Sequence, residues 1–354
     1  MKLFRHIRFC LLLLPLLAGC SKDTYQEETR PEISFSPGVT VETKTGSAKP
    51  NDQSVLIADG KQISLFGQLV LNEGAQDESV TSIFNNRILG CTYTNGNYVW
   101  SYSPLQYWEE EGHYYFAGVY PYHASNVSLG NDFYVNVLYR AGDNNDLMVA
   151  RGHRNMSPLS PDKSVVPLEF NHACSAVRFL FGKESTESTP DEFTLTNFSL
   201  SDLSVSGTLR VQAQMATNPL VSLSNHDAAY WIPGTLGTLF SWTADTQAAR
   251  KNIPHPTTTH DPDGYLQMGW YYMVPQTLAA SAKVSFSISY SGQSPLTTEF
   301  NINDRDGVAG DDVWEPNQVY NYYITIAKSG LRLTVVTTPW DSVNVSTDDM
   351  TFMP

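Results

Sequence analysis

Charged side chains are scarce in this sequence. They make up 16% of its 354 residues, compared with roughly a quarter in an average globular domain. Those present are unbalanced, with 36 acidic residues against 22 lysines and arginines and a formal net charge of −14. Because a field of that sign repels phosphate groups, we expect no nucleic-acid partner and no attraction to anionic lipid surfaces.

Signatures of catalysis and of cofactor binding are also missing. The chain contains no G-x-S-x-G, H-E-x-x-H, P-loop or G-x-G-x-x-G sequence, which are the common nucleophile, zinc and nucleotide motifs. Residues 255–264 gather two histidines and two aspartates, and residues 303–312 gather four aspartates. Neither segment has the spacing of a known metal-binding loop, so we interpret both as solvated loops. The sequence therefore predicts neither an enzyme nor a cofactor.

Cysteines and long apolar runs are few. Of the four cysteines, Cys10 lies in the N-terminal apolar run and Cys20 follows it directly. Cys91 and Cys174 remain, with no C-x-x-C motif and no Cys/His pairing at metal-ligand spacing. We expect two buried thiols, while a single disulfide between them stays an alternative. The one apolar run to consider for a membrane, residues 9–17, is too short to remain as a spanning helix.

The first twenty residues follow the order of a secretory signal. Three basic residues precede the apolar run, and small residues close it. Its end, Leu17-Ala18-Gly19-Cys20, resembles the lipobox of bacterial lipoproteins, in which the cysteine thiol is acylated and becomes the mature N-terminus. We therefore interpret residues 1–19 as a lipoprotein signal peptide and Cys20 as the site of lipid (palmitate) attachment.

Alternation of large apolar and small polar side chains dominates the chain after residue 54. It is clearest in residues 284–290 and 320–326, where every second side chain is large. Such period-2 alternation is typical of half-buried strands. No segment keeps an apolar helical face for more than about two turns. The pattern predicts an all-β protein built from β-sandwiches.

A polar segment with three prolines, residues 152–167, interrupts the alternation. We place a domain boundary there, with an N-terminal β-sandwich over residues 45–165 and a C-terminal β-sandwich over residues 166–354. Residues 20–44 come before both sandwiches. We expect them to be a tether that carries one strand-like piece, residues 33–41.

Three further segments carry a resemblance to a known family. They are residues 166–179, 271–276 and 314–324, with the sequences VPLEFNHACSAVRF, YYMVPQ and WEPNQVYNYYI. In this order, behind a lipobox, they resemble the fimbrillin-like family of type V pilus subunits. Within the first segment we interpret His172 as an imidazole at the edge of the core, hydrogen-bonded to the backbone.

The resemblance implies two transthyretin-like β-sandwiches and export to the outer membrane as a lipoprotein. It also implies that a trypsin-like protease removes an N-terminal strand and that a strand from another fimbrial subunit takes its place. Lys44, followed by Thr45, fits such a cleavage site. Arg30 stays an alternative, although the proline after it makes a poor substrate bond.

On this basis we expect a structural subunit of a cell-surface fimbrium that contributes to adhesion to a host or bacterial surface ligand. Fourteen residues follow Trp340, which is short for a strand that must reach a second subunit, so we favour the tip of the filament. A lipid-retained anchor subunit and a surface glycan-binding lipoprotein are the alternatives.

Aromatic runs bear on the glycan-binding alternative, because exposed rings can stack on sugars. They lie in or beside strand-like segments, where large rings usually fill a core, and we interpret them so. The runs are Trp100-Ser101-Tyr102, Tyr107-Trp108 and Trp270-Tyr271-Tyr272.

The lipobox gives a direct prediction. Replacing Cys20 with Ala should abolish incorporation of radiolabelled palmitate, because the acylated thiol is lost. Cys91→Ala, far from the signal, serves as the control and should label like the wild-type chain. Undiminished labelling of the Cys20→Ala protein would contradict the interpretation.

Overall fold

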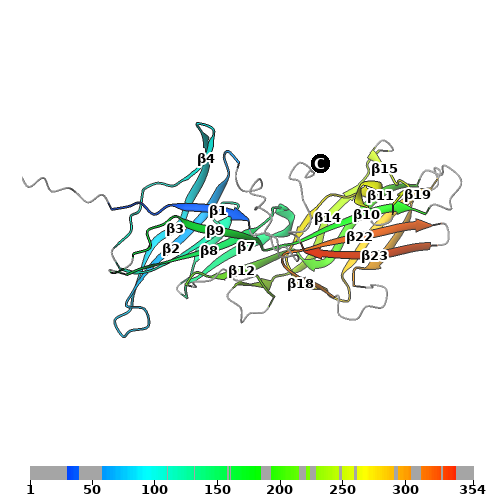
Figure 1. Ribbon diagram of the computed structural model, residues 1–354. Helices are drawn as coiled ribbons and strands as arrows, with labels where there is room; N and C mark the ends of the chain where they lie inside the picture. Colours follow the sequence, from blue (N-terminus) through cyan, green and yellow to red (C-terminus); the bar gives the residue numbers. More distant parts are fainter. Residues whose placement is uncertain are drawn as a thin grey trace, which may run out of the picture.

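The structure is a computed structural model, and it describes most of the chain between residues 30 and 339 (Figure 1). Cys20, Lys44 and Thr45 lie outside the described residues. The described ranges are 30–39, 58–109, 111–130, 132–157, 159, 161–184, 193–214, 221–223, 229–246, 249–258, 261–290, 294–303, 312–327 and 330–339.

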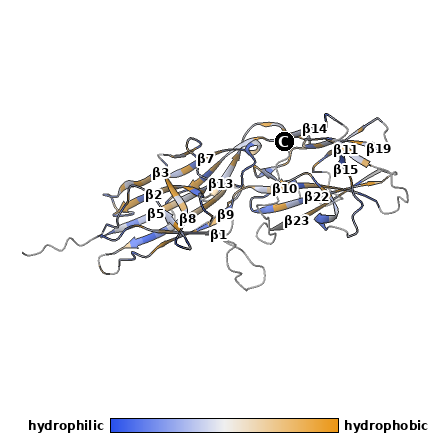
Figure 2. Ribbon diagram, turned by 90° about the horizontal axis from the view of Figure 1, so that it is seen from above, coloured by the Kyte–Doolittle hydropathy of each residue, from blue (hydrophilic) through white to orange (hydrophobic). Residues whose placement is uncertain are grey.

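Nearly all regular structure in these ranges is strand, which confirms the all-β prediction. The helical pieces described are two short 3-10 turns, η2 (Ala141–Asp143) and η4 (Pro262–Gly264). The alternating segments become β19 (Lys283–Tyr290) and β22 (Gln318–Ala327). Figure 2 shows hydrophobic and hydrophilic residues side by side along the strands of both lobes. None of the described helical pieces has the length and apolarity needed to span a membrane.

The N-terminal lobe is built on a seven-stranded sheet with the order β1-β9-β8-β5-β2-β3-β4. Neighbouring strands are antiparallel, except that β1 runs parallel to β9. One face of this sheet buries a cluster rich in aromatic rings, which we call the ring core. The strands are β1 (Phe35–Val39), β2 (Gln62–Leu71), β3 (Ser79–Thr94), β4 (Asn97–Ser101), β5 (Gly112–Tyr120), β8 (Met148–Met156) and β9 (Val166–His172).

The other face of the seven-stranded sheet belongs to a larger core cluster together with a four-stranded sheet of order β13-β12-β7-β6. Phe66 and Val149 come from the first sheet, while Val137, Leu209 and Trp231 come from the second; all five are buried. The four strands are β6 (Val127–Leu129), β7 (Tyr134–Arg140), β12 (Ser206–Gln212) and β13 (Ala229–Pro233).

Two further sheets form the C-terminal lobe and pack through aromatic contacts. The Phe179 and Phe198 ring centroids are 5.3 Å apart, and those of Phe181 and Phe286 are 5.1 Å apart. One sheet joins β10 (Ser175–Lys183) to β16 (Leu266–Gln267), β17 (Tyr271–Met273), β22 and β23 (Gly330–Pro339). The other joins β11 (Phe193–Ser204) to β14 (Leu236–Thr243), β15 (Lys251–Asn252), β19 and β20 (Leu296–Asn301), and a small pair consists of β18 (Gln276–Thr277) and β21 (Val313–Trp314).

Strand pairing crosses the boundary that we placed between residues 165 and 166. β9 follows that point in sequence, yet it pairs with β8 and β1 of the N-terminal sheet. β12 and β13 also lie beyond it, and β12 pairs with β7. The proline-rich segment connects two neighbouring antiparallel strands, and an exposed connection of this kind has the same composition as a linker between domains. A domain boundary between residues 165 and 166 stays a prediction. The strand pairing does not follow it, because β9 and β12 belong to sheets of the N-terminal lobe.

The lobes meet where the turn after β7 contacts the start of β17. The Tyr139 hydroxyl donates to the Tyr272 carbonyl at 2.8 Å, and the Tyr272 amide donates to Asn144 Oδ1 at 2.9 Å. His172 Nδ1 lies 2.9 Å from Asp146 Oδ2. The interpretation of His172 did not include this carboxylate, which a distant turn brings to the imidazole. Periodicity along the chain carries no information about such a contact.

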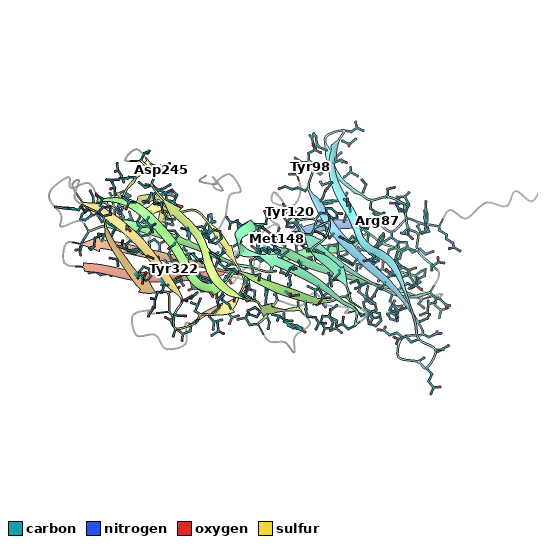
Figure 3. All side chains as sticks on the ribbon, turned by 180° about the vertical axis from the view of Figure 1, so that it is seen from behind. Arg87, Tyr98, Tyr120, Met148, Asp245 and Tyr322 are labelled. Atoms are coloured by element: carbon teal, nitrogen blue, oxygen red, sulfur yellow. The ribbon has the colours of Figure 1, made fainter. Side chains whose placement is uncertain are left out.

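The described residues bear on two predictions about side chains, the buried thiols and the buried rings. Cys91 and Cys174 are buried free thiols. Tyr102, Trp108 and Tyr272 are buried, as expected of rings in strand-rich cores. Tyr107, in the same aromatic runs, is exposed instead, and another exposed ring is Tyr98 on the β3–β4 hairpin, which projects from the N-terminal lobe (Figure 3).

Candidate functional site

The first described segment of the chain, residues 30–39, is inserted between two parts of the N-terminal lobe. On one side β1 pairs with β9, from Phe35 opposite Val166 to Val39 opposite Phe170. On the other side the Ile33 amide donates to the Gln106 carbonyl at 2.9 Å, and the Trp108 amide donates to the Pro31 carbonyl at 3.1 Å. We call the place that this segment occupies, between β9 and residues 106–108, the β1 site.

Two side chains of the segment enter the ring core. Ile33 is 0% exposed and Phe35 is 6% exposed. The Phe35 ring meets three others edge to face, with centroid distances of 5.1 Å to Phe116, 5.8 Å to Phe84 and 5.9 Å to Tyr102. Edge-to-face pairs stabilise a core beyond the burial of their area, by about 0.5–1.5 kcal/mol each. Phe35 is therefore the main anchor of β1.

A buried hydroxyl supports the backbone of the segment. Tyr102 Oη donates to the Ile33 carbonyl at 2.6 Å. Burial raises the pKa of Tyr102 to about 12. The phenol therefore keeps its proton throughout the neutral range and remains a donor to whichever backbone carbonyl occupies that position.

The start of the segment contributes little. Arg30 Nη1 lies 2.9 Å from Glu109 Oε2, but the two side chains are 63% and 51% exposed. Exposed ion pairs of this kind are worth about 0–1 kcal/mol. The segment is thus held by Ile33, Phe35 and its backbone bonds.

The predicted processing residues flank this segment. Arg30 begins it, while Lys44 and Thr45 lie outside the described residues, beyond the end of β1. Cleavage after Arg30 leaves β1 attached to the rest of the chain, whereas cleavage after Lys44 separates it. The structure thus gives the two alternatives different consequences.

The sequence analysis did not identify the residues that line the β1 site. Phe84, Tyr102 and Phe116 come from β3, the β4–β5 connection and β5. A local signal was present, because Phe84 and Phe116 lie in segments rich in β-branched and aromatic residues, which favour strands, but nothing local indicates that their rings meet Phe35. The two loops weighed for metal binding extend outside the described residues. Within the described ranges, no group of three or more His, Cys, Asp or Glu side chains could hold a metal ion.

Comparison with protein-family models identifies the chain. The model of the fimbrillin-like family matches residues 45–340, which is most of the sequence. The protein belongs to the fimbrillin-like family. The family resemblance inferred from the three sequence segments is confirmed.

Solved structures share the fold of this fimbrillin-like chain. A putative cell adhesion protein from Bacteroides uniformis is 16% identical, with a TM-score of 0.50 over 88% of this chain and 99% of the other. A fimbrial protein from Bacteroides vulgatus is 15% identical, with the same TM-score and coverage. Comparison with curated proteins finds no match.

The packing of Phe35 in this fimbrillin-like chain gives a testable prediction. Phe35→Ala should lower the free energy of unfolding of the N-terminal lobe by about 3 kcal/mol, because it leaves a cavity among three rings. Ser36→Ala changes the neighbouring exposed residue and should stay within about 0.5 kcal/mol of wild type. Urea unfolding followed by tryptophan fluorescence measures both, since Trp108 is buried in the same core. Equal stability of the two variants would contradict the assignment of Phe35 as the anchor.

Proposed function

We propose that this protein is a structural subunit of a cell-surface fimbrium, a type V pilus, with no catalytic role. In this proposal the precursor is exported to the outer membrane as a lipoprotein anchored through Cys20. It then joins the filament by exchanging its first strand for a strand of another subunit. Family membership supports the fimbrial role, and the names of the two structural relatives, a fimbrial protein and a putative cell adhesion protein, agree with it.

The single observation that carries strand exchange is the two-sided insertion of residues 31–39. Loss of this segment leaves the β9 edge without its parallel partner and uncovers rings of the ring core. Unpaired sheet edges bind extended peptides through main-chain hydrogen bonds, and pockets for alternate side chains select their sequence. An incoming strand must therefore run parallel to β9, with an apolar residue in place of Ile33 and an aromatic one in place of Phe35.

Cleavage after Lys44 is the proposed trigger. It releases residues 20–44, which contain both the lipid and β1, and leaves Thr45 as the new N-terminus. A cut after Arg30 would release the lipid yet keep β1 covalently attached beside β9. The first cut alone therefore frees the β1 site for a strand of another subunit.

This mechanism can be tested with matched variants. Trypsin-like protease should cut the wild-type protein and the Arg30→Gln variant before Thr45 and promote their self-association or capture of a partner subunit. Lys44→Gln should remain uncut at that bond and remain monomeric under the same treatment. N-terminal sequencing and size-exclusion chromatography measure the two effects. A cut at Lys44 with no change in association would reject strand exchange.

For the position in the filament we propose the tip. Residues 341–349 are mostly polar, with Val343 and Val345 as an alternating apolar pair, which is little apolar content for a donated strand. A subunit that accepts a strand without donating one ends the filament. A tip subunit is also where an adhesive contact with a host or bacterial surface would be made.

A specific observation favours a second candidate, a shaft subunit. The last five residues, Met350-Thr351-Phe352-Met353-Pro354, repeat the order of Ile33-Ser34-Phe35-Ser36-Pro37: apolar, hydroxyl, Phe, any residue, Pro. Placed parallel to β9, they would put Phe352 where Phe35 packs. The glycan-binding alternative has less support, because most rings of the aromatic runs, among them Tyr102, Trp108 and Tyr272, are buried and Tyr107 is the exposed one. An anchor subunit would retain its lipid after assembly, which mass spectrometry of isolated filaments detects.

Immunogold labelling of filaments separates the two positions. A tip subunit should label filament ends, and deletion of residues 341–354 should leave that labelling unchanged, because a tip donates no strand. A shaft subunit should label the whole length, and Phe352→Ala should shorten the filaments while Val343→Ala has a smaller effect. Labelling along the shaft would reject the tip assignment, and end labelling that survives Phe352→Ala would reject the shaft.

A further inference from the structure

A buried arginine in the N-terminal lobe has an unfilled pair of hydrogen-bond donors. Arg151, on β8, is 4% exposed. Its Nη1 donates to the Gln212 carbonyl at the end of β12, at 2.9 Å. Its Nε and Nη2 are buried and have no hydrogen-bond partner. These two nitrogens form the side of the guanidinium that binds carboxylate or sulfate through two parallel hydrogen bonds.

The charge of this group is uncompensated within the described residues. Burial lowers the pKa of Arg151 to about 10, with a smaller opposing contribution from Tyr134. The guanidinium is therefore still a cation at neutral pH. A buried cation without an opposite charge is costly, and proteins normally pair it.

The neighbouring acidic side chains are engaged elsewhere. Glu73 accepts the Tyr115 hydroxyl at 2.8 Å, Asp132 pairs with Arg210, and Asp162 lies 3.4 Å from Arg154. None of the three acts on Arg151. The counter-charge must therefore come from outside this set.

A second polar group on the same face of the sheet also lacks a partner. Gln68 is 3% exposed, and its Oε1 is buried without a hydrogen bond. Gln68 is the cross-strand partner of Tyr115, which in turn pairs with His153. This row of cross-strand partners is adjacent to the row that Phe66, Ala117 and Arg151 form. The small Ala117 side chain separates the two larger ones of its row. Gln68 is neutral and cannot balance the charge, but it makes this region polar.

We propose that Arg151 holds a small oxyanion between the seven-stranded and four-stranded sheets, with two of the ion's oxygens accepting from Nε and Nη2. The ligand class is a carboxylate or a sulfate-type ion, because both present paired oxygens at the required spacing. Nη1, fixed by the Gln212 carbonyl, orients the guanidinium for this contact. The site is separate from the β1 site, since Arg151 lies on β8 and projects from the face opposite the ring core.

Anomalous diffraction locates the ion directly. Crystals of the protein grown with selenate, and others soaked in formate, distinguish a tetrahedral ligand from a carboxylate. We expect a selenium peak, or planar formate density, within hydrogen-bond distance of both Nε and Nη2. Only water at the guanidinium in both crystals, or a peak that persists in Arg151→Met, overturns the proposal.

Thermal unfolding tests the same site in solution. In sodium sulfate or formate, compared with sodium chloride at equal ionic strength, the wild-type Tm should rise by about 3 °C more than that of Arg151→Met. Arg87→Met is the matched control, because Arg87, labelled in Figure 3, also donates Nη1 to a backbone carbonyl at 2.9 Å but is only half-buried. It should respond like wild type. If the Tm of wild type and that of Arg151→Met rise equally, the rise is a general effect of the salt on stability, and the proposed site is rejected.

A carboxylate of the chain itself could balance the charge of Arg151, and a separate variant tests this alternative. Asp227 lies outside the described residues, two positions before Ala229, which pairs with Val211 of β12. Asp227→Asn should respond to sulfate like wild type. If Asp227→Asn gains an oxyanion response that the wild-type protein lacks, the counter-charge is this carboxylate and the proposal is wrong.

Discussion

The insertion of Phe35 among Phe84, Tyr102 and Phe116 is the contact on which the N-terminal lobe depends. It places residues 31–39 between β9 and residues 106–108, so that Pro31 and Ile33 are hydrogen-bonded on one side and β1 on the other. An edge strand usually leaves one side open, and an open edge invites other strands. Here the first strand covers the ring core and satisfies the β9 edge at once. In the proposed mechanism this arrangement makes β1 replaceable by another extended chain with an apolar residue and an aromatic residue two positions apart.

The rest of the molecule provides a rigid frame around that strand. β9 continues through Ala173 and Cys174 into β10, so the strand that pairs with β1 also begins the C-terminal lobe. Backbone bonds hold this passage: the Ala173 amide donates to the Leu147 carbonyl at 2.7 Å, and the Asn317 amide donates to the Cys174 carbonyl at 2.9 Å. Trp231 Nε1 adds a bond to the Ala173 carbonyl at 2.7 Å. One core cluster runs through both lobes. None of these three bonds involves β1.

Local sequence patterns predicted much of the strand content and little of the pairing. Alternation over residues 284–290 and 320–326 located β19 and β22, because a half-buried strand imposes its period on the side chains. The prolines of residues 152–167 indicated a break, but that break is a connection within one sheet. The carboxylate partner of His172 was missed for a related reason. Asp146 is 26 positions away, and only folding of the turn after β7 brings it to the imidazole.

The sequence by itself determined the strand-rich class and the family, because these depend on local composition and on short motifs. It also contains the repeat of Ile33–Pro37 at residues 350–354, visible without coordinates. Tertiary structure decided that Phe35 meets rings from β3, the β4–β5 connection and β5, and that β9 and β12 belong to the N-terminal sheets. It also buried Arg151 without a counter-charge among the described residues. These features join residues far apart in the chain. Strand periodicity specifies which face a side chain takes and leaves open which strand lies beside it.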